Sequence, residues 1–314
     1  MRVLVVGATG AMGTSLVPRL VEAGHQVLGT TRSAARVPAI QAAGGEGVVL
    51  EVLDRSAVAG ALDRVRPEVV IHQATALQHL GASALRNIDR AFAETNRLRT
   101  VGTENLLAAA GPAGVRRVVA QSFTGWTNEP VGGPVKTESD PFDPSPAANA
   151  RQTLAAIRRL ESLVTGAPEI EGVVLRYGGF YGPGTGLARE GEQTDAIRKR
   201  MFPVVGDGGG IWSFSHIQDA AAATVAALDG PPGIFNIVDD DPAPVSVWLP
   251  FLADALGAPP PRRIPGWLAR PLLGPHLFAM MTSARGSSNA KARRELDWQP
   301  TYRSWREGFV HGLG

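Results

Sequence analysis

The chain has 314 residues, of which 44% are hydrophobic and 19% are charged, and it contains no cysteine. A chain of this length can bury a substantial core, and the missing cysteines exclude disulfide bonds, thiolate-bound metals and a cysteine nucleophile. Its 31 lysines and arginines nearly balance its 29 acidic residues, without the dense basic run that nucleic-acid binding needs. No apolar run reaches the length of about 18 residues that a membrane span requires. We therefore expect a cytoplasmic globular protein, a monomer or homodimer, whose partner is a small molecule.

Short apolar runs alternate with helical patterns through the first half of the chain. The runs show little period-2 alternation, which is typical of strands buried on both faces of a parallel sheet. Such strands are expected at Arg2–Val6, Gln26–Thr30, Gly47–Val52, Val69–His72, Val115–Gln121 and Gly172–Arg176. Between them, the spacing of apolar residues predicts crossover helices at Ala11–Ala23, Ser56–Val65, Phe92–Ala110 and Arg151–Thr165. The pattern predicts a doubly wound, Rossmann-type α/β sheet.

A glycine-rich loop lies between the first predicted strand and the first predicted helix, with glycines at Gly7, Gly10 and Gly13. These glycines let the backbone turn tightly and approach a pyrophosphate, and the helix N-terminus offers free N–H groups to the phosphates. A glycine triplet alone is weak evidence, but its place between strand and helix, with a second strand about 20 residues further on, predicts a dinucleotide site. A plain glycine-rich turn is the alternative.

The end of the second predicted strand indicates which dinucleotide is bound. Sites that prefer NAD usually carry an acidic residue here, whereas this chain has Arg32 and Ser33 and no acid from residue 26 through 45. An arginine pairs with the 2′-phosphate of the adenosine through its planar fork. NADP(H) is therefore favoured over NAD(H).

A change in amino-acid composition and periodicity divides the chain into two predicted domains. Residues 1–176 are expected to form the dinucleotide-binding domain, and residues 177–314, rich in Gly–Pro clusters and tryptophan, a smaller substrate-binding lobe. Residues 211–237 regain the strand–helix–strand pattern and are expected to return to the first domain. The long loop Asn128–Ala148 is expected to be a functional lid.

Motifs in a fixed order make the chain resemble the extended and atypical short-chain dehydrogenase/reductases, the group of NAD-dependent epimerases and dehydratases. The motifs are GATGAMG at 7–13, LEVLD at 50–54, VVIHQATA at 69–76, TNRLRTVGTENLLAAA at 95–110, GVRRVVAQS at 114–122, LRYGGFYGPG at 175–184, SFSHIQDAA at 213–221 and RGSSNAKARRELDWQP at 285–300. The resemblance spans nearly the whole chain.

The resemblance implies a set of cofactor contacts. The glycine-rich loop would hold the pyrophosphate, and the segment after the third strand would lie beside the adenine. The loop after the fourth strand would line the cofactor, and the segment from 177 would reach the carboxamide of the nicotinamide. The residues implied are Gly7, Thr9, Gly10, Ala11 and Met12; Glu51 and Val52; Ala74 and Thr75; and Tyr177, Gly178, Gly179 and Phe180.

The chain departs from the family at the catalytic residues. Members that oxidise alcohols or reduce ketones use Tyr-x-x-x-Lys, whose spacing places both side chains on one helix face. The chain has three tyrosines, and none is followed four residues later by lysine. Counted back from Glu161, the tyrosine position is Thr153 and the lysine position is Ile157. A register shifted by one residue gives Leu154 and Arg158 instead, which likewise supplies no tyrosine and lysine.

The remaining catalytic candidates are hydroxyl groups. Ser122 and Thr124 follow the fifth strand, where they could hydrogen-bond a substrate carbonyl or satisfy a strand-end backbone group. Tyr177 is a third candidate that would assist by hydrogen bonding, and Trp126 is expected to contact the substrate. The acidic run Asp239–Asp241 is interpreted as a solvated loop, and no metal site is predicted.

These observations predict an NADPH-dependent ketoreductase that acts on a bulky aromatic polyketide, as in antibiotic biosynthesis. The proton would come from the substrate or from water, because an adjacent phenol can stabilise the developing alkoxide. Two alternatives stay open at this point. A non-catalytic NADP(H)-binding regulator would explain the missing tyrosine and lysine, and a sugar-nucleotide epimerase or dehydratase would hold NAD tightly.

Overall fold

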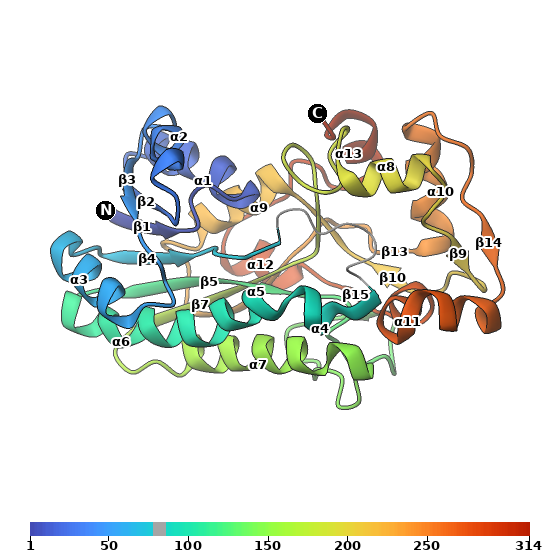
Figure 1. Ribbon diagram of the computed structural model, residues 1–314, viewed down its shortest axis with the longest axis horizontal. Coiled ribbons are helices and arrows are strands. Elements are labelled where there is room, and N and C mark those ends of the chain that lie inside the picture. The colour runs from blue at the N-terminus through green and yellow to red at the C-terminus, as the bar shows by residue number, and fades with distance from the viewer. Residues whose placement is uncertain (78–85) are drawn as a thin grey trace.

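The computed structural model describes residues 1–77 and 86–314, and its centre is a sheet of seven parallel strands in the order β12-β7-β5-β4-β1-β2-β3 (Figure 1). The predicted Rossmann-type fold is confirmed. The third strand ends three residues before the predicted Val52, and the fifth begins two residues later than predicted. The strands are β1 (Arg2–Val6), β2 (Gln26–Thr31), β3 (Glu46–Val49), β4 (Val69–His72), β5 (Arg117–Phe123), β7 (Glu171–Tyr177) and β12 (Gly233–Ile237).

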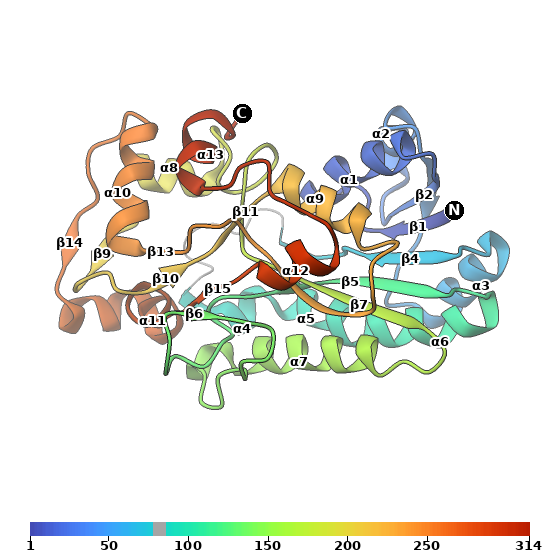
Figure 2. The ribbon, with the colours of Figure 1, turned by 180° about the vertical axis from the view of Figure 1, so that it is seen from behind.

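Helices cover both faces of this sheet, which explains the continuous apolar runs. Along β1, Val3 and Val5 enter one core cluster while Leu4 and Val6 enter the other. Figure 2 shows the two helical layers from behind. The first cluster is closed by α1 (Ala11–Glu22), α2 (Val37–Ala42), α9 (Ile217–Ala226) and α12 (Ala290–Glu295), and the second by α3 (Arg55–Val65), α6 (Thr103–Ala113) and α7 (Arg151–Thr165).

The helix predicted as one piece from Phe92 to Ala110 is interrupted in the structure, so that prediction is corrected. The chain forms a π-helical turn, η3 (Leu98–Gly102), between two α-helical segments. The His72 imidazole at the end of β4 donates from Nε2 to the carbonyl oxygen of Leu98 at 3.1 Å, at the start of this turn. The segments around it are α4 (Ile88–Ala91), α5 (Ala93–Arg97) and α6. Short π-helical turns within α-helices are frequent at functional sites.

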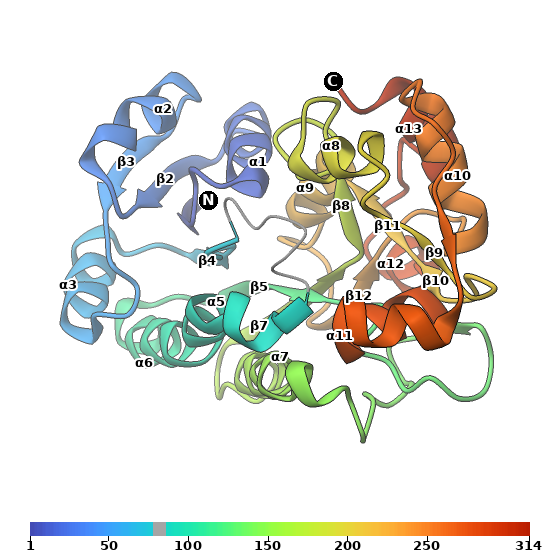
Figure 3. The same ribbon diagram turned by 45° about the vertical axis from the view of Figure 1, so that its right-hand side comes forward.

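The C-terminal part of the chain builds a third core beside the carboxyl ends of the strands (Figure 3). Trp248, Trp305, Phe214 and Phe309 lie at its centre and are at most 1% exposed. The helices are α8 (Glu192–Arg198), α10 (Val245–Ala255), α11 (Gly266–Thr282) and α13 (Trp305–His311), with 3-10 turns η1 (Ala34–Arg36) and η4 (Ala148–Ala150) elsewhere. Short strand pairs are β6 (Val135–Lys136) with β15 (Gly286–Ser287), β8 (Gly179–Tyr181) with β11 (Phe214–His216), β9 (Val204–Val205) with β14 (Arg263–Ile264), and β10 (Ile211–Trp212) with β13 (Ala243–Pro244).

Two segments connect this lobe to the sheet. After the first part of the lobe, α9 packs on α1 and β12 pairs with β7, so residues 217–237 lie with the central sheet. The loop Asn128–Ala148 touches the lobe, since β6 pairs with β15 and the Arg285 guanidinium donates to the Pro130 carbonyl at 2.7 Å. The predicted domain boundaries and the lid role of this loop stay predictions. Within residues 1–77 and 86–314, no helix combines the length and apolar character of a membrane span.

A buried ion pair fastens α7 to the sheet. Both Nε and Nη2 of Arg176 donate to the Glu161 carboxylate, at 2.8 and 2.7 Å, and each side chain is 5% exposed. The Ser122 hydroxyl donates to the same carboxylate at 2.6 Å. Glu161 thereby joins one helix to two neighbouring strands, β5 and β7.

We expect Glu161→Gln to destabilise the protein strongly. The neutral amide would leave the Arg176 guanidinium buried without a charged partner, at a cost of about 3–5 kcal/mol in the free energy of unfolding. Glu104→Gln is the matched control, because its ion pair with Arg159 has side chains 45% and 54% exposed and contributes at most about 1 kcal/mol. Urea denaturation of both variants measures the difference, and equal losses would contradict the assignment.

Candidate active site

The glycine-rich loop forms a close crossing between β1, α1 and the segment after β4. Gly7 has φ +89°, and a Cβ atom there would lie 2.8 Å from the Cα of Ala74. A Cβ on Gly13 would lie 2.4 Å from the backbone of Ala8. Only glycine fits at these two positions, because both neighbours are backbone atoms.

The N-terminus of α1 is open to an anion. Gly10 is its N-cap residue, no side chain caps it, and its first turn carries no acidic residue. The first N–H groups of the helix therefore have no partner within the helix and present a partial positive charge. Ala11 and Met12 begin this turn, so the predicted pyrophosphate residues surround one set of free donors. This geometry fits the diphosphate of a dinucleotide.

The end of β2 supports the same loop. The Thr30 hydroxyl accepts from the Gly7 N–H at 3.3 Å, and the Thr31 hydroxyl accepts from the Ser33 N–H at 3.2 Å. Thr9 contacts Thr31 through its hydroxyl at 3.5 Å. The side chain of Arg32 is 57% exposed and lies 3.5 Å from Glu94. An exposed pair at this distance contributes little, so the Arg32 guanidinium is available to a phosphate group.

The other predicted cofactor residues lie along the same edge of the sheet, at the carboxyl ends of its strands. Glu51 accepts from the Leu53 N–H at 3.0 Å, which shapes the turn after β3. The Val52 carbonyl accepts from Asn105 at 3.1 Å. Ala74 and Thr75 follow β4 directly and are partly exposed.

The segment after β7 lies close to β11. The Gly178 N–H donates to the Ser215 hydroxyl at 2.9 Å, and a Cβ on Gly178 would lie 2.5 Å from the Ser213 carbonyl oxygen. The Gly179 N–H donates to that same oxygen at 2.9 Å. Phe180 stacks obliquely on Tyr177, with ring centroids 5.1 Å apart. The cofactor roles of these residues stay predictions.

The three hydroxyl groups predicted to assist catalysis are all engaged with the protein. Ser122 donates to Glu161, as described above. The Thr124 hydroxyl lies 2.7 Å from the Ser287 hydroxyl and is 1% exposed. The Tyr177 hydroxyl lies 2.7 Å from Thr224, and burial raises its pKa well above the ordinary value. These bonds favour structural roles, above all for Ser122 and Tyr177, and the catalytic roles stay predictions.

In the register counted back from Glu161, the expected tyrosine and lysine positions on α7 hold residues whose side chains have no acidic or basic group. Thr153, in the tyrosine position, is fully buried, and its hydroxyl donates to Asp89 at 2.8 Å. It also accepts from the Asn96 amide at 3.1 Å. Ile157, in the lysine position, is 1% exposed. Neither Thr153 nor Ile157 can therefore act as the acid or base that a tyrosine and lysine pair would supply.

Trp126, the predicted substrate residue, has a partner that the sequence did not indicate. The His276 imidazole of α11 meets its ring edge to face, with centroids 4.7 Å apart. His276 is 2% exposed, its Nε2 has no hydrogen-bond partner, and burial lowers its pKa to about 4. A neutral imidazole thus packs edge to face against an indole ring. The two residues are 150 positions apart, so only tertiary structure joins them.

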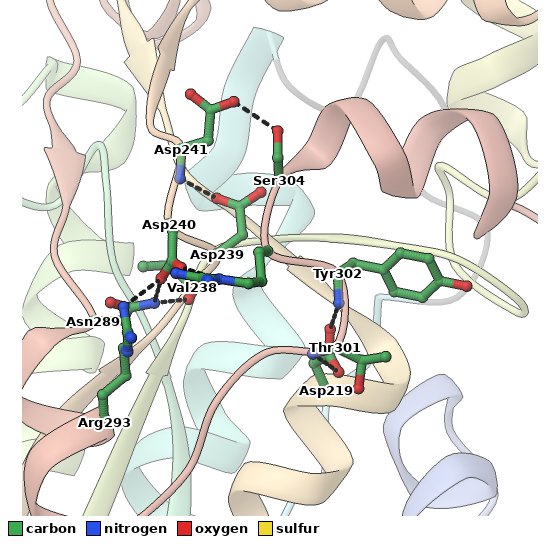
Figure 4. Close-up of polar contacts among 11 residues, drawn as sticks. Asp219, Val238, Asp239, Asp240, Asp241, Asn289, Arg293, Thr301, Tyr302 and Ser304 are labelled. Atoms are coloured by element: carbon green, nitrogen blue, oxygen red, sulfur yellow. Dashed lines mark hydrogen bonds and ion pairs between the residues drawn. The ribbon is translucent and has the colours of Figure 1, made fainter.

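The acidic run Asp239–Asp241 is not a solvated loop, which corrects that expectation (Figure 4). Asp239 is 3% exposed, and burial raises its pKa well above the ordinary value. Asp240 and Asp241 connect the lobe to the C-terminal segment. Asp240 accepts from Asn289 (2.8 Å), Arg303 (2.9 Å) and Arg293 (3.3 Å). Asp241 accepts from Ser304 (2.7 Å) and Arg306. Nearby, Asp219 accepts from the N–H groups of Thr301 (2.8 Å) and Tyr302 (3.1 Å). Across the described ranges, no group of three or more metal-ligating side chains is present.

Two alanine substitutions separate folding from nucleotide binding. A Cβ on Gly10 would meet only the Gly7 carbonyl oxygen, at 3.5 Å, so Gly10→Ala should fold normally but crowd the phosphates and weaken NADPH binding by about tenfold or more. Gly13→Ala should lower the melting temperature, because its Cβ would overlap the Ala8 backbone. Thermal unfolding and fluorescence titration with NADPH measure the two effects. Unchanged NADPH affinity in Gly10→Ala would contradict the placement of the phosphates.

Comparison with known proteins agrees with this geometry. The model of the NAD dependent epimerase/dehydratase family matches residues 3–237. A 3-diazoavenalumate denitrifying reductase of a Streptomyces species is 44% identical over 311 residues, covering 98% of this chain and 99% of the relative. A 4-hydroxy-2-methyl-3-oxo-4-farnesyl-3,4-dihydroquinoline-1-oxide ketoreductase of Stigmatella aurantiaca is 27% identical and covers 82% of this chain and 74% of the relative.

Solved structures of similar fold include UDP-glucose 4-epimerases, one of them in complex with NAD. The UDP-glucose 4-epimerase of Thermus thermophilus in complex with NAD superposes with a TM-score of 0.74 at 24% identity, covering 100% of this chain and 98% of the epimerase. That of Thermotoga maritima gives a TM-score of 0.75 at 21% identity and covers 100% and 97%. At these identities the likeness shows the fold. Together with the family match and the reductase relatives, it establishes that this chain belongs to the NAD dependent epimerase/dehydratase family and is an NAD(P)-dependent oxidoreductase.

Proposed function

We propose that this protein is an NADPH-dependent reductase that transfers hydride to an aromatic substrate, while the proton comes from the substrate or from water. The observation that carries the proposal is the occupation of the tyrosine and lysine positions of α7 by Thr153 and Ile157. Both are buried, and Thr153 is held by Asp89. A site built in this way can position a substrate but offers it no phenol or ammonium group.

The other titratable groups of the site support the same conclusion. Burial lowers the pKa values of His72 and His276 to about 4, so both imidazoles are neutral at neutral pH. Burial raises the pKa of Tyr177, which keeps its phenol protonated. The loss of an enzyme acid typically costs a factor of about 10²–10⁴ in rate. Positioning alone supplies effective molarities of roughly 10⁵–10⁸ M in favourable cases, so hydride transfer survives without that acid.

An aromatic ketone beside a phenol is the first candidate substrate. The phenol stabilises the developing alkoxide and can supply the proton, so it replaces the missing tyrosine. The relative of Stigmatella aurantiaca, which is named as a ketoreductase, supports this class. Trp126 is partly exposed and packs against the buried His276, so its ring offers an apolar surface for a flat ring system, in keeping with a polyketide or similar secondary metabolite.

A diazo group is the second candidate, favoured by the 44% identity to a reductase named for 3-diazoavenalumate. A bound dihydronicotinamide supplies a hydride, which with one proton converts a ketone to an alcohol, or a diazo carbon to C–H with release of dinitrogen. The diazo reaction forms no alkoxide, so it has no need of a tyrosine and lysine pair. Neither of the two electrophiles, the ketone beside a phenol or the diazo group, requires a proton from an acidic group of the enzyme.

Purified protein should oxidise NADPH in the presence of a hydroxyaryl ketone, a diazophenol, or both. Mass spectrometry identifies the alcohol or the denitrogenated arene, and a reaction without protein corrects for spontaneous reduction of the diazo compound. The pH profile of kcat should show no enzyme group between about pH 6 and 9, because the buried histidines and Tyr177 titrate outside that range.

Substitution of the three hydroxyl groups completes this test. Ser122→Ala, Thr124→Val and Tyr177→Phe should each retain turnover within about tenfold, whereas a loss of about 10²–10⁴ would identify that hydroxyl as the acid. Tightly bound NAD released on denaturation, with no net consumption of cofactor, would instead indicate the closed redox cycle of an epimerase.

The preference for NADPH depends on Arg32 in this proposal. Arg32→Ala should weaken NADPH binding by about tenfold or more while leaving NADH binding nearly unchanged, because only NADPH carries the 2′-phosphate. Glu94→Gln is the matched control: it removes the neighbouring carboxylate at 3.5 Å and should maintain or strengthen NADPH binding. Titrations of both variants with each nucleotide measure these effects. An equal change for NADPH and NADH would contradict the role of Arg32.

A further inference from the structure

Arg99 is a buried cation joined through Asn96 to Thr153 of α7. It belongs to the π-helical turn η3 and is 6% exposed. Burial lowers its pKa to about 10, which still leaves the guanidinium protonated at neutral pH. A buried charge is costly unless hydrogen bonds and an opposite charge compensate for the lost water.

The protein supplies little of that compensation. Nη1 of Arg99 donates to the Asn96 side-chain oxygen at 3.3 Å, and the guanidinium carbon lies 5.8 Å from the centre of the Phe92 ring. Within residues 1–77 and 86–314, no carboxylate lies within 4.0 Å of Arg99. Glu161 influences Arg99 only through space, because its oxygens are occupied by Arg176 and Ser122. The guanidinium therefore retains donors for an anion that the described residues do not provide.

The position of Arg99 connects it with the reacting part of the site. Its partner Asn96 also donates to Thr153, which stands in the tyrosine position of α7. The imidazole of His72, the last residue of β4, donates to the carbonyl oxygen of Leu98, the residue before Arg99. Arg99 thus lies one side chain from the place where the family's catalytic tyrosine would stand, on a different helix from the missing lysine.

We propose that Arg99 binds an anionic oxygen of the substrate, a phenolate or a carboxylate on the aromatic ring system, and so determines which substrates are reduced. This inference rests on the proposed reductase function and names its substrate class. A planar guanidinium matches a carboxylate or phenolate through charge-assisted hydrogen bonds, which are strong in a site shielded from water. The substrate anion would complete the compensation of the buried charge.

The binding test uses hydroxynaphthoate, its methyl ester and its O-methyl ether, titrated calorimetrically into the full chain in the presence of NADP⁺. The unaltered protein should bind hydroxynaphthoate at least about 30-fold more tightly than one of the two derivatives, as expected for a desolvated charge pair. A selective loss with the ester identifies the carboxylate as the partner, and a selective loss with the ether identifies the phenolate. Equal affinity for all three compounds would overturn the proposal, whatever the fate of any variant.

Arg99→Gln should weaken the binding of hydroxynaphthoate until it equals that of the weaker-binding methylated derivative. The affinities of this derivative and of NADP⁺ should stay within about threefold of those of the unaltered protein. Arg97→Gln is the matched control, because Arg97 lies two residues away in α5 and its side chain is 64% exposed in a pair with Glu94. Uniform weakening of all ligands by Arg99→Gln would assign Arg99 a structural role, and selective loss of NADP⁺ would assign it to the cofactor; either result overturns the proposal.

The same measurements separate this inference from the reductase function, because binding is observed without turnover. Anion binding that depends on Arg99, in a protein that reduces neither ketone nor diazo compound, would leave the inference intact and reject the reaction. Turnover of a ketone or diazo compound whose kcat/KM is unchanged by Arg99→Gln and by methylation of the substrate oxygens would do the opposite.

Discussion

The buried carboxylate of Glu161 is the interaction on which the arrangement of the site depends. It accepts hydrogen bonds from Ser122 on β5 and from both arms of Arg176 on β7, so it fixes the distance between α7 and the carboxyl ends of two strands. These hydrogen bonds to the Glu161 carboxylate have a chemical consequence. A hydroxyl that donates at 2.6 Å to a buried carboxylate is a poor donor to a substrate. The contact that positions α7 therefore also removes Ser122 from the set of free hydroxyl groups.

Thr153 and Ile157, on the face of α7 towards the site, are side chains without an acidic or basic group. Thr153 is held between Asp89 and Asn96, and Ile157 packs without a polar group. The positive charge that a lysine would bring is found instead on Arg99, one helix away. The fold of the family is thus retained, and in the proposed function Arg99 attracts the substrate where a lysine would tune a phenol. This difference links the packing of the site to the class of reaction.

The sequence predicted the sheet well, because strands buried on both faces must be apolar at every position and the glycines of the first loop admit no side chain. It also predicted the tight glycine-rich turn between the first strand and the first helix, since Gly7 and Gly13 act through local backbone geometry; the cofactor contacts there stay a prediction. Arg99 escaped prediction because the π-helical turn at 98–102 shifts the helical periodicity by about one residue. His276 escaped because its pairing with Trp126 depends on the docking of α11. The acidic run at 239–241 was misjudged, since its arginine partners lie more than 50 residues later in the chain.

The proposed direction of hydride transfer, reduction of the substrate, rests on the same electrostatics. An epimerase must first remove a proton from a substrate alcohol, which requires a base whose pKa lies near the working pH. The histidines of this site have pKa values of about 4, and the tyrosine beside it has a raised pKa. The former are weak bases and the latter stays protonated, so none of these three groups is suited to accept a proton from an alcohol near neutral pH. Reduction of an electrophile needs only a positioned substrate and a source of hydride. In the proposed function, an anionic substituent of the substrate would pair with Arg99, while the proton would come from a separate phenol of the substrate or from water.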